Sequence, residues 1–422
     1  MIWHPFTAQL GGEAPLKISR AEREYVFDVE GRRYVDAIAS WWTVIHGHNH
    51  PQIVGAINRQ LAELDHVIFA GFTHGSAELV DRALMHLTGE RFTHSFFSDN
   101  GSTAVEVMLK LAVQYWHNEG QPARNVFIKF DSAYHGDTVG AMSAGGESVF
   151  NRAFEPLLFK TKSFRYPRQD ADLTVLDEIE TWVRQNRDSV AGIIVEPLIA
   201  AAGGMHFQEP QLLTAIDRIC KSYDLLLLFD EVFTGLGRTG KMFAYEHAGV
   251  TPDLLALAKG LTGGSLPLAV TLVAERVHRS FASADPQKTF YHGHTMSGNP
   301  LGCAAAVASL GLCHEEKFLP QVRALQQKML RYWRNLEGLF PERLHSARSL
   351  GAVSAANLHT GSAAAGYTFR HGAEMRRQAL AEGVILRPLG NVIYVTPPYN
   401  ISDSALEKTF ACIGEIINDY EP

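Results

Sequence analysis

Short apolar runs alternate with helical patterns between Pro51 and about His314, and this alternation limits the possible folds of the 422-residue chain more than any other feature. The clearest runs are "NVFIKF", "AGIIVEP", "LLLLFDE" and "DLLALAK". Strands that are buried on both faces have such continuous apolar sequences, whereas half-exposed strands alternate polar and apolar residues. The pattern therefore predicts an α/β domain over residues 51–314, with a mostly parallel central sheet and flanking helices.

The two ends of the chain have a different pattern. Two strand-like runs in "EYVFDVEGRRYVDAIA" meet at Glu30 and Gly31, which predicts a hairpin. The last part of the chain mixes strand-like and helical runs and ends in the helical pattern "DSALEKTFACIGEIINDY". We expect residues 1–50 and 315–422 to form together a smaller α+β domain beside the large one.

Composition limits the class of partner. The formal net charge of −7 argues against nucleic acid or an anionic membrane, because both favour a basic surface. The four cysteines lack the close pairing of a zinc site and the density of a disulfide scaffold. The opening "MIWHPFTAQLGG" has neither the basic region nor the apolar stretch of a signal peptide. We expect a cytoplasmic protein that acts on small molecules and binds neither nucleic acid nor a membrane.

Polar side chains follow the predicted strands, where open α/β sheets place their functional groups. Lys259 ends the run "DLLALAK", and a buried ammonium is usually paired, neutral or chemically modified. Asp230 and Tyr134 follow two other strands. Gly101 and Ser102 enter a helical pattern, and the first amide groups and positive dipole end of a helix suit a phosphate.

These groups together match the chemistry of pyridoxal 5'-phosphate. A lysine of lowered pKa is a nucleophilic amine that forms an imine with a carbonyl group. A carboxylate such as Asp230 would keep the pyridine nitrogen protonated so that the ring accepts electrons, and Tyr134 could cover the ring face. Taken singly, each group also has an ordinary interpretation. The Lys259 amine could lie in water, Asp230 could be a helix cap or part of a loop ion pair, Tyr134 could serve in packing, and Ser102 or Thr103 could be a helix N-cap.

Two other motifs suggest different chemistry. "GLGRTGK" at 235–241 resembles phosphate loops, but Met242 stands where a nucleotide loop needs Ser or Thr, and "DEVFT" separates the glycines from the strand. His46, His48 and His50 alternate in "HGHNHP", yet no cysteine or matching set of carboxylates lies nearby. We therefore predict no metal, and we expect the glycine loop to lie near the active site.

Several separated motifs occur in the order found in the class III (omega-type) aminotransferases, which they resemble over nearly the whole chain. These are Tyr134-His135-Gly136-Asp137, Asp230-Glu231-Val232, the "GLGRTGK" loop and Lys259. The resemblance implies a pyridoxal-phosphate-dependent transferase of fold type I. It also implies a ping-pong transamination, in which the Lys259 amine moves a proton between the amino donor and the cofactor.

The resemblance implies a role for each matching position. Lys259 would bind the cofactor as an imine, and Asp230 would contact its ring nitrogen. Tyr134 would lie at the ring face and beside the substrate. Gly101 and Ser102 would form the phosphate turn.

A neighbouring subunit completes the site in this family. By resemblance, Thr295 would reach the phosphate of the neighbouring subunit, with His294 beside it, and Gly293 would contact the substrate. The resemblance therefore implies a homodimer with shared active sites.

Four further stretches narrow the resemblance to a branch of the class whose keto substrate is an apolar chain with an amine and a terminal carboxylate. They are "IWHPFT", "SWWTVIHGHNHP", "FYHGHTMSGNPLGCAAA" and "VILRPLGNVIYVTPPY". Trp41 and Trp42 would supply apolar walls, and Arg387 would bind the carboxylate with two hydrogen bonds. The alternative is that both tryptophans fill the core and that Arg387 is a surface charge.

Two compounds remain candidates for the amino donor. The branch implies S-adenosylmethionine, but members that use it typically carry tyrosine where this chain has Phe6, and lysine is the alternative donor. Another class III enzyme, acting on ornithine, 4-aminobutyrate or a β-amino acid, is the second hypothesis. A nonenzymatic sensor and a nucleotide-binding ATPase are the hypotheses from other classes.

Overall fold

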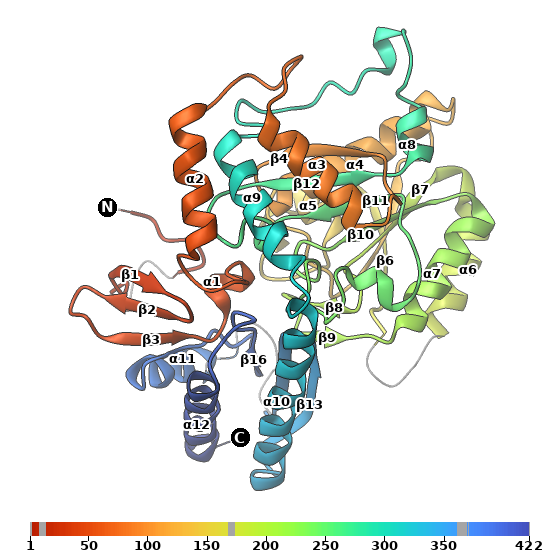
Figure 1. Cartoon of the computed structure of the whole chain (residues 1–422). Coiled ribbons are helices and arrows are strands. Elements are labelled where there is room, and N and C mark those ends of the chain that lie inside the picture. The colour runs from red at the N-terminus through yellow and green to blue at the C-terminus, as the bar shows by residue number, and fades with distance from the viewer. Residues whose placement is uncertain (1, 8–13, 168–173, 361–368, 370, 422) are drawn as a thin grey trace.

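The computed structural model describes residues 2–7, 14–167, 174–360, 369 and 371–421. Its larger part is a seven-stranded sheet in the order β4-β12-β11-β10-β7-β5-β6 (Figure 1). The strands are β4 (His94–Ser98), β5 (Val126–Phe130), β6 (Thr161–Phe164), β7 (Val190–Val195), β10 (Leu226–Asp230), β11 (Leu254–Leu257) and β12 (Ala269–Val273). Strand β12 runs antiparallel to both neighbours, and the other adjacent pairs are parallel. The predicted fold class is confirmed.

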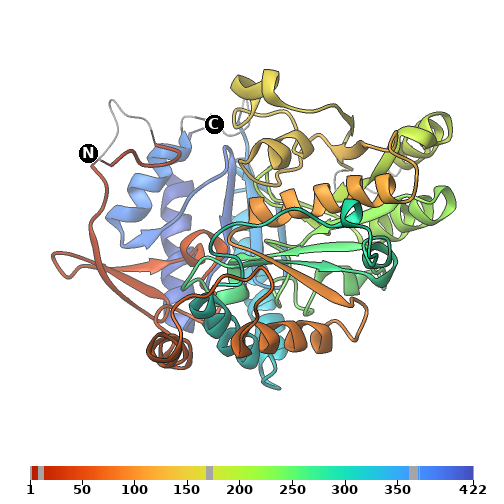
Figure 2. The same cartoon turned by 90° about the horizontal axis from the view of Figure 1, so that it is seen from above.

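Helices lie on both faces of this sheet, as the view from above shows (Figure 2). They are α2 (Pro51–Glu63), α3 (Gly75–Leu87), α4 (Gly101–Asn118), α5 (Val139–Ala144), α6 (Thr174–Asn186), α7 (Pro210–Tyr223), α8 (Glu275–Arg279) and α9 (Pro300–Cys313). Helix α4 packs against β4, β11 and β12, and α7 packs against β7 and β10. Within the described residues, no helix combines the length and the apolar character needed to cross a membrane.

Alternate residues of the central strand β10 pack into opposite layers. Leu226 and Leu228 belong to the apolar cluster formed with α4, whereas Leu227 and Phe229 belong to the cluster on the other face. All four are at most 2% exposed. Both faces of β10 are buried, and this explains why its sequence is a continuous apolar run.

The two ends of the chain build the smaller part together. One sheet has the order β1-β2-β3-β15 and another has β13-β14-β16. The strands are β1 (Ile18–Glu22), β2 (Tyr25–Asp28), β3 (Arg33–Asp36), β13 (Leu344–Leu350), β14 (Val353–Leu358), β15 (Val384–Ile385) and β16 (Val392–Val395). The helices are α10 (Phe318–Leu339), α11 (His371–Ala381) and α12 (Asp403–Asp419).

The pairing of β3 with β15 ties the N-terminal strands to the C-terminal part, so the red and blue ends lie side by side in both views (Figures 1 and 2). The predicted hairpin is confirmed, because β2 and β3 are antiparallel around Glu30 and Gly31. The predicted C-terminal helix is α12. The domain boundaries at residues 50 and 314 stay a prediction.

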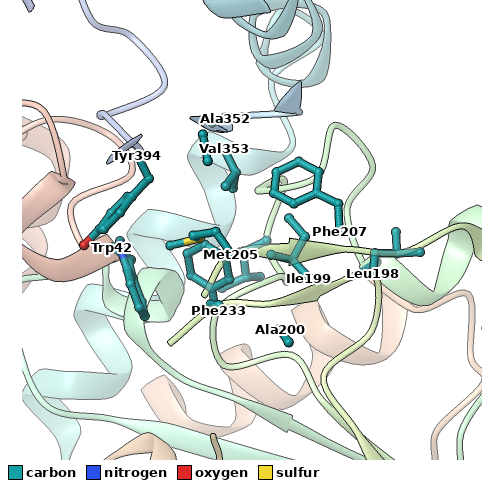
Figure 3. Close-up of a cluster of buried hydrophobic side chains, with 14 of the residues drawn as sticks. Trp42, Leu198, Ile199, Ala200, Met205, Phe207, Phe233, Ala352, Val353 and Tyr394 are labelled. Atoms are coloured by element: carbon teal, nitrogen blue, oxygen red, sulfur yellow. The ribbon is translucent and has the colours of Figure 1, made fainter. Parts of the chain in front are cut away.

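A shared apolar core joins the large and small parts near the end of β10. The ring of Trp42 lies 4.6 Å from that of Phe233 and 6.0 Å from that of Tyr394, measured between centroids (Figure 3). Met205 and Val353 belong to the same cluster and are fully buried. Two short strands, β8 (Ile199–Ala200) and β9 (His206–Phe207), contribute side chains to it. This core fixes Trp42 relative to the loop that follows β10.

Candidate active site

A cavity of about 120 Å³ lies at the carboxyl ends of the central strands. Its walls come from the segments that follow β5, β7, β10 and β11 and from the start of α4, as expected for an open α/β sheet. The predicted site residues that line it are Trp42, Gly101, Ser102, Tyr134, Asp230 and Lys259. The fold therefore collects these groups from distant parts of the sequence into one place.

Lys259 follows β11 by two residues and has a left-handed backbone, with φ 46°. Its Nζ lies 5.2 Å from the centre of the Trp42 ring. Burial disfavours the ammonium form and lowers the pKa of Lys259, although the carboxylates of Asp230 and Glu196 act in the opposite direction. The net shift favours the neutral amine, which is the form that attacks a carbonyl carbon.

Asp230 is the last residue of β10 and is 5% exposed. Its Oδ2 lies 2.7 Å from Nδ1 of His135, and its Oδ1 accepts a hydrogen bond of 3.0 Å from the N–H of Val232. The Nε2 of His135 is buried and has no hydrogen-bond partner among the described residues. These contacts hold a carboxylate in the cavity wall, where it could keep a pyridine nitrogen protonated.

Two buried glutamates near Asp230 have different surroundings. Glu196 lines the cavity and accepts hydrogen bonds of 2.9 and 3.1 Å from the N–H groups of Tyr134 and Ala201. Burial raises the pKa of Glu196 to about 7. Glu231 lies outside the cavity lining and accepts two backbone hydrogen bonds of 2.8 and 2.9 Å, and burial raises its pKa to about 8. Glu196 thus places a titratable group near Lys259, whereas Glu231 fixes the loop after β10.

Helix α4 begins at the cavity wall. The side chain of Asn100 accepts from the N–H of Thr103 at 3.1 Å, and Oγ1 of Thr103 accepts from the N–H of Asn100 at 3.1 Å. Asn100 is therefore the N-cap, and the alternative interpretation of Ser102 or Thr103 as the cap is wrong. The first-turn N–H groups of Gly101 and Ser102 have no partner within the helix. A Cβ atom at Gly136 would overlap Oγ of Ser102, so this close approach requires glycine. This end of α4 fits a phosphate group.

The two predicted tryptophans lie in a left-handed turn, α1 (Ala39–Trp42), whose four residues have φ of 46°, 46°, 67° and 74°. Such a backbone costs about 1–2 kcal/mol per L-residue because Cβ crowds the carbonyl oxygen. The turn gives adjacent indoles different surroundings: Trp42 is 4% exposed in the core, and Trp41 is 37% exposed. The interpretation that both tryptophans fill the core is wrong for Trp41.

Arg387 lies beside Trp41, with its Cζ 4.7 Å from the centre of the indole ring. It is half-buried, and its role as a carboxylate ligand rather than a surface charge stays a prediction. The ring of Phe6 contacts Trp41 edge-on at 5.2 Å between centroids. Phe150 contacts both Phe6 and Tyr134, at 5.9 and 5.7 Å. A row of aromatic rings therefore leads from Arg387 to Tyr134 at the cavity.

The predicted residues Gly293, His294 and Thr295 lie in the segment between α8 and α9. Gly293 and Thr295 are exposed and His294 is half-buried. None of the three belongs to the described lining of the cavity in their own chain. A single chain therefore does not bring them to the site, and their role toward a second subunit stays a prediction.

Arg238, in the "GLGRTGK" loop, is a charged residue near the site whose role the sequence left open. It is 1% exposed, and its Nη2 donates to the carbonyl of Trp42 at 2.7 Å. Its Nε and Nη1 have no hydrogen-bond partner among the residues described. Its charge also contributes to the lowered pKa of Lys259. The sequence showed that an arginine lies in a glycine-rich loop after Asp230. That this arginine is buried is known only from the structure. No sequence motif pointed to Phe150.

Comparisons with known proteins agree with this geometry. The chain matches the family "Aminotransferase class-III" over residues 7–417 and belongs to that family. It is 42% identical to the adenosylmethionine-8-amino-7-oxononanoate aminotransferase of Synechococcus elongatus, over 99% of this chain and 98% of that protein. It is 39% identical to the protein of the same name from Geobacter sulfurreducens, over 96% of this chain and 93% of that protein.

Solved structures give the same class. The crystal structure of adenosylmethionine-8-amino-7-oxononanoate aminotransferase from Methanocaldococcus jannaschii has a TM-score of 0.93 at 33% identity, covering 100% of this chain and 97% of that chain. A PLP-bound amine transaminase from an uncultivated Pseudomonas species also has a TM-score of 0.93, at 28% identity, covering 99% of this chain and 98% of that chain. The chain is a pyridoxal-phosphate-dependent aminotransferase. The start of α4, the buried Asp230 and the buried Lys259, whose pKa is lowered, fit that cofactor.

Proposed function

We propose that this aminotransferase converts 8-amino-7-oxononanoate to 7,8-diaminononanoate in biotin biosynthesis, with S-adenosylmethionine as the amino donor. Four relatives named adenosylmethionine-8-amino-7-oxononanoate aminotransferase are 36% to 42% identical over nearly the whole chain. The single observation that carries the proposal is the stacking of Arg387 on Trp41 at the end of the aromatic row.

This arrangement suits a substrate with an apolar chain and a terminal carboxylate. Trp41, Phe6 and Phe150 offer apolar ring surface beside the cavity. The planar guanidinium of Arg387 can form two parallel hydrogen bonds to a carboxylate, and stacking on the indole restrains its orientation. The substrate carbon chain would lie along the rings, with its carboxylate at Arg387 and its keto group in the cavity.

Pyridoxal phosphate, when bound, supplies a carbonyl group that takes up the amino group and a ring that accepts an electron pair. We propose that Gly101 and Ser102 hold its phosphate, that Asp230 keeps its ring nitrogen protonated and that Tyr134 covers its ring face. Nζ of Lys259, whose pKa burial lowers, would move the proton from the donor carbon to the cofactor in the first half-reaction and move a proton in the reverse direction in the second.

We also propose a homodimer that shares its active sites. Tyr291 and Met296 are 75% and 46% exposed in the segment that holds Gly293 and Thr295. Large apolar side chains exposed together mark interaction surfaces. In this arrangement Thr295, with His294 beside it, reaches the phosphate of the neighbouring subunit, and Gly293 contacts its substrate. Light scattering should give about twice the chain mass of 46.6 kDa, and a fully active monomer would contradict the shared site.

The substrate and donor can be tested together. The holoenzyme is incubated with 8-amino-7-oxononanoate and either S-adenosylmethionine or lysine, and the diamine is measured by mass spectrometry. Diamine formed with S-adenosylmethionine supports the proposal, whereas diamine formed with lysine alone keeps the substrate and replaces the donor. A clear preference for 2-oxoglutarate as acceptor would overturn the substrate and favour an enzyme for ornithine, 4-aminobutyrate or a β-amino acid.

We further propose that the enzyme is cytoplasmic. Its four cysteines are buried and unpaired, which suits a reducing compartment. Cell fractionation with an antibody to the chain tests this location, and recovery outside the cytoplasmic fraction would contradict it.

A further inference from the structure

Two histidines and a glutamate meet at the start of the edge strand β4. His94, Glu275 and His278 each offer a nitrogen or oxygen ligand atom, and these atoms lie within 4.8 Å of one another. Strand β4 runs from His94 toward Gly101 at the cavity, so the cluster lies at the opposite end of the strand from the active site. From this cluster we propose a binding site for a divalent transition-metal ion such as Zn²⁺.

The sheet register holds the cluster together. His94 lies opposite Val273 in the antiparallel ladder of β4 and β12, and the N–H of Thr93 donates to the carbonyl of Val273 at 3.0 Å. Helix α8 begins at Glu275, two residues after Val273. Glu275 and His278 are three positions apart and therefore share one face of that helix. The backbone thus fixes the distance between His94 and the other two ligands.

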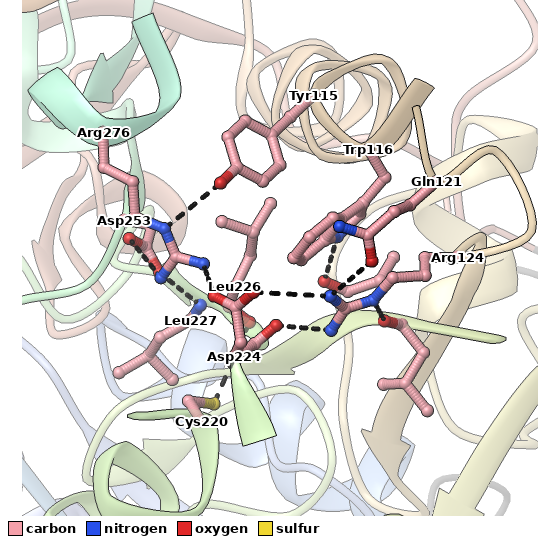
Figure 4. Close-up of polar contacts among 12 residues, drawn as sticks. Tyr115, Trp116, Gln121, Arg124, Cys220, Asp224, Leu226, Leu227, Asp253 and Arg276 are labelled. Atoms are coloured by element: carbon pink, nitrogen blue, oxygen red, sulfur yellow. Dashed lines mark hydrogen bonds and ion pairs between the residues drawn. The ribbon is translucent and has the colours of Figure 1, made fainter. Parts of the chain in front are cut away.

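Arg276 anchors the same helix to the sheet. Its guanidinium pairs with Asp224 at 2.5 Å and Asp253 at 3.7 Å, and it donates to the hydroxyl of Tyr115 at 3.4 Å (Figure 4). These contacts fasten α8 through a side chain other than the proposed ligands. Glu275 and His278 therefore stand on a short helix whose position is already fixed.

The donor set suits zinc rather than a hard cation. Two neutral imidazoles and one carboxylate are common zinc ligands and leave a fourth position for water, whereas Mg²⁺ and Ca²⁺ prefer oxygen ligands. The rings of His94 and His278 are stacked, with centroids 3.3 Å apart, so two charged imidazoliums would repel each other.

Binding requires two local rearrangements. Stacked imidazoles direct their lone pairs side by side, so one ring must turn out of the stack to bring both nitrogens onto one ion. Glu275 is held by the hydroxyl of Thr93 at 3.3 Å and by Arg279 at 3.5 Å, and the ion replaces the second contact. All these side chains are partly or largely exposed, so the movements meet little steric resistance.

This proposal departs from the sequence-based expectation of no metal. That expectation considered the alternating histidines His46, His48 and His50, which are close in sequence. His94 and His278 are far apart in sequence, and their meeting depends on the pairing of β4 with β12. A motif search along the chain therefore has no signal for this site.

Calorimetric titration of the holoenzyme with ZnCl₂ tests the proposal. We expect one ion per chain at this site, and removal of a ligand in His94→Ala, His278→Ala or Glu275→Gln should weaken binding by about tenfold or more. His345→Ala is the matched control, because His345 and His359 also pair, with ring centroids 4.3 Å apart, but belong to no described three-ligand group. This control should bind zinc as the parent does, and MgCl₂ should give no binding at this site.

A second measurement needs no variant. Zn²⁺ should protect His94 and His278 from diethyl pyrocarbonate, as read by mass spectrometry of peptides, while His345 stays reactive. Zinc binding that is equally strong in the His94→Ala and His278→Ala variants would overturn the proposal. So would a parent enzyme in which zinc protects neither histidine.

Discussion

The two ends of the large sheet use buried charged side chains in opposite ways. At the amino ends, Arg124 donates to the carbonyl of Val190 at 2.9 Å, pairs with Asp224 at 3.7 Å and stacks on Trp116, with its Cζ 3.3 Å from the ring centre (Figure 4). At the carboxyl ends, Arg238 has two buried nitrogens without a hydrogen-bond partner in the described part of the chain.

This difference indicates that charged residues at the amino ends stabilise the fold, whereas those at the carboxyl ends serve the reaction. Buried polar groups normally have hydrogen-bond partners, and paired groups such as those at the amino ends stabilise the fold. Groups in the cavity wall that the chain leaves unsatisfied or whose pKa it shifts, such as Nε2 of His135 and Glu196, are where a cofactor or substrate supplies contacts. We therefore expect substitutions of cavity-lining residues at the carboxyl ends to change turnover, and substitutions of paired charges at the amino ends to change the free energy of unfolding.

The strongest test of this separation is Lys259→Ala. Because no other described lining residue offers an amine at this position, turnover should fall by more than about 10⁴-fold. The fold should survive, since the substitution removes a buried amine and leaves the core clusters intact. Steady-state kinetics and a thermal melt measure the two effects.

Lys221→Ala is the matched control for that prediction. Lys221 is exposed on α7, pairs with Asp217 at 2.7 Å and does not belong to the described lining of the cavity. Its loss should leave turnover unchanged and alter stability by less than about 0.5 kcal/mol. Normal turnover in Lys259→Ala would contradict the claim that the residues at the carboxyl ends of the sheet carry out the reaction.

The next largest effect is expected for Arg387→Ala. Losing a charge-assisted pair of hydrogen bonds should lower kcat/KM for the keto acid by about 10- to 100-fold and leave the half-reaction with the amino donor unchanged. Arg387→Lys should rescue only part of this loss, because an ammonium cannot form the planar double contact. Single-turnover kinetics of the two half-reactions measure the effect. Equal losses in both would show that Arg387 does not select the keto acid.

The sequence predicted the parts of this comparison that depend on local pattern. Continuous apolar runs identified β10 and β11, because strands buried on both faces need no polar alternation. Asp230 and Lys259 followed from their positions at the ends of those strands. The sequence could not predict the burial of Arg238 or the contacts of Phe150, because both depend on segments that meet only in the folded chain. The left-handed turn at Trp41 could not be predicted from the sequence either, because it contains no glycine, the residue that usually adopts a positive φ.

At the amino ends, Arg124→Ala should destabilise the fold without changing the chemistry. The Arg124 side chain is 3% exposed, and its removal leaves the Val190 carbonyl and the carboxylate of Asp224 without this partner. We expect a loss of about 2 kcal/mol in the free energy of unfolding, measured in urea. Turnover per folded molecule should stay at the parent value. A selective loss of turnover would show that the amino ends are coupled to the active site.

The smallest predicted effect concerns the pH dependence of stability at the carboxyl ends. Burial raises the pKa of Glu231 to about 8, from 4.5 for the ordinary side chain. Between these values the unfolded chain has lost the proton and the folded chain keeps it, so the free energy of unfolding falls as pH rises. The limit is about 1.4 kcal/mol per pH unit for one proton.

In Glu231→Gln, the free energy of unfolding should therefore decrease by about 1 kcal/mol less between pH 7 and pH 8 than in the parent. Urea unfolding at both pH values measures this difference. Glu196→Gln is the matched comparison, because the pKa of Glu196 is raised only to about 7 and most of its contribution ends there. An unchanged slope in Glu231→Gln would mean that its two backbone hydrogen bonds keep the carboxylate ionised at neutral pH. In that case Glu231 would resemble the hydrogen-bonded charges at the amino ends of the sheet. Only the residues that line the cavity would then distinguish the carboxyl ends from the amino ends.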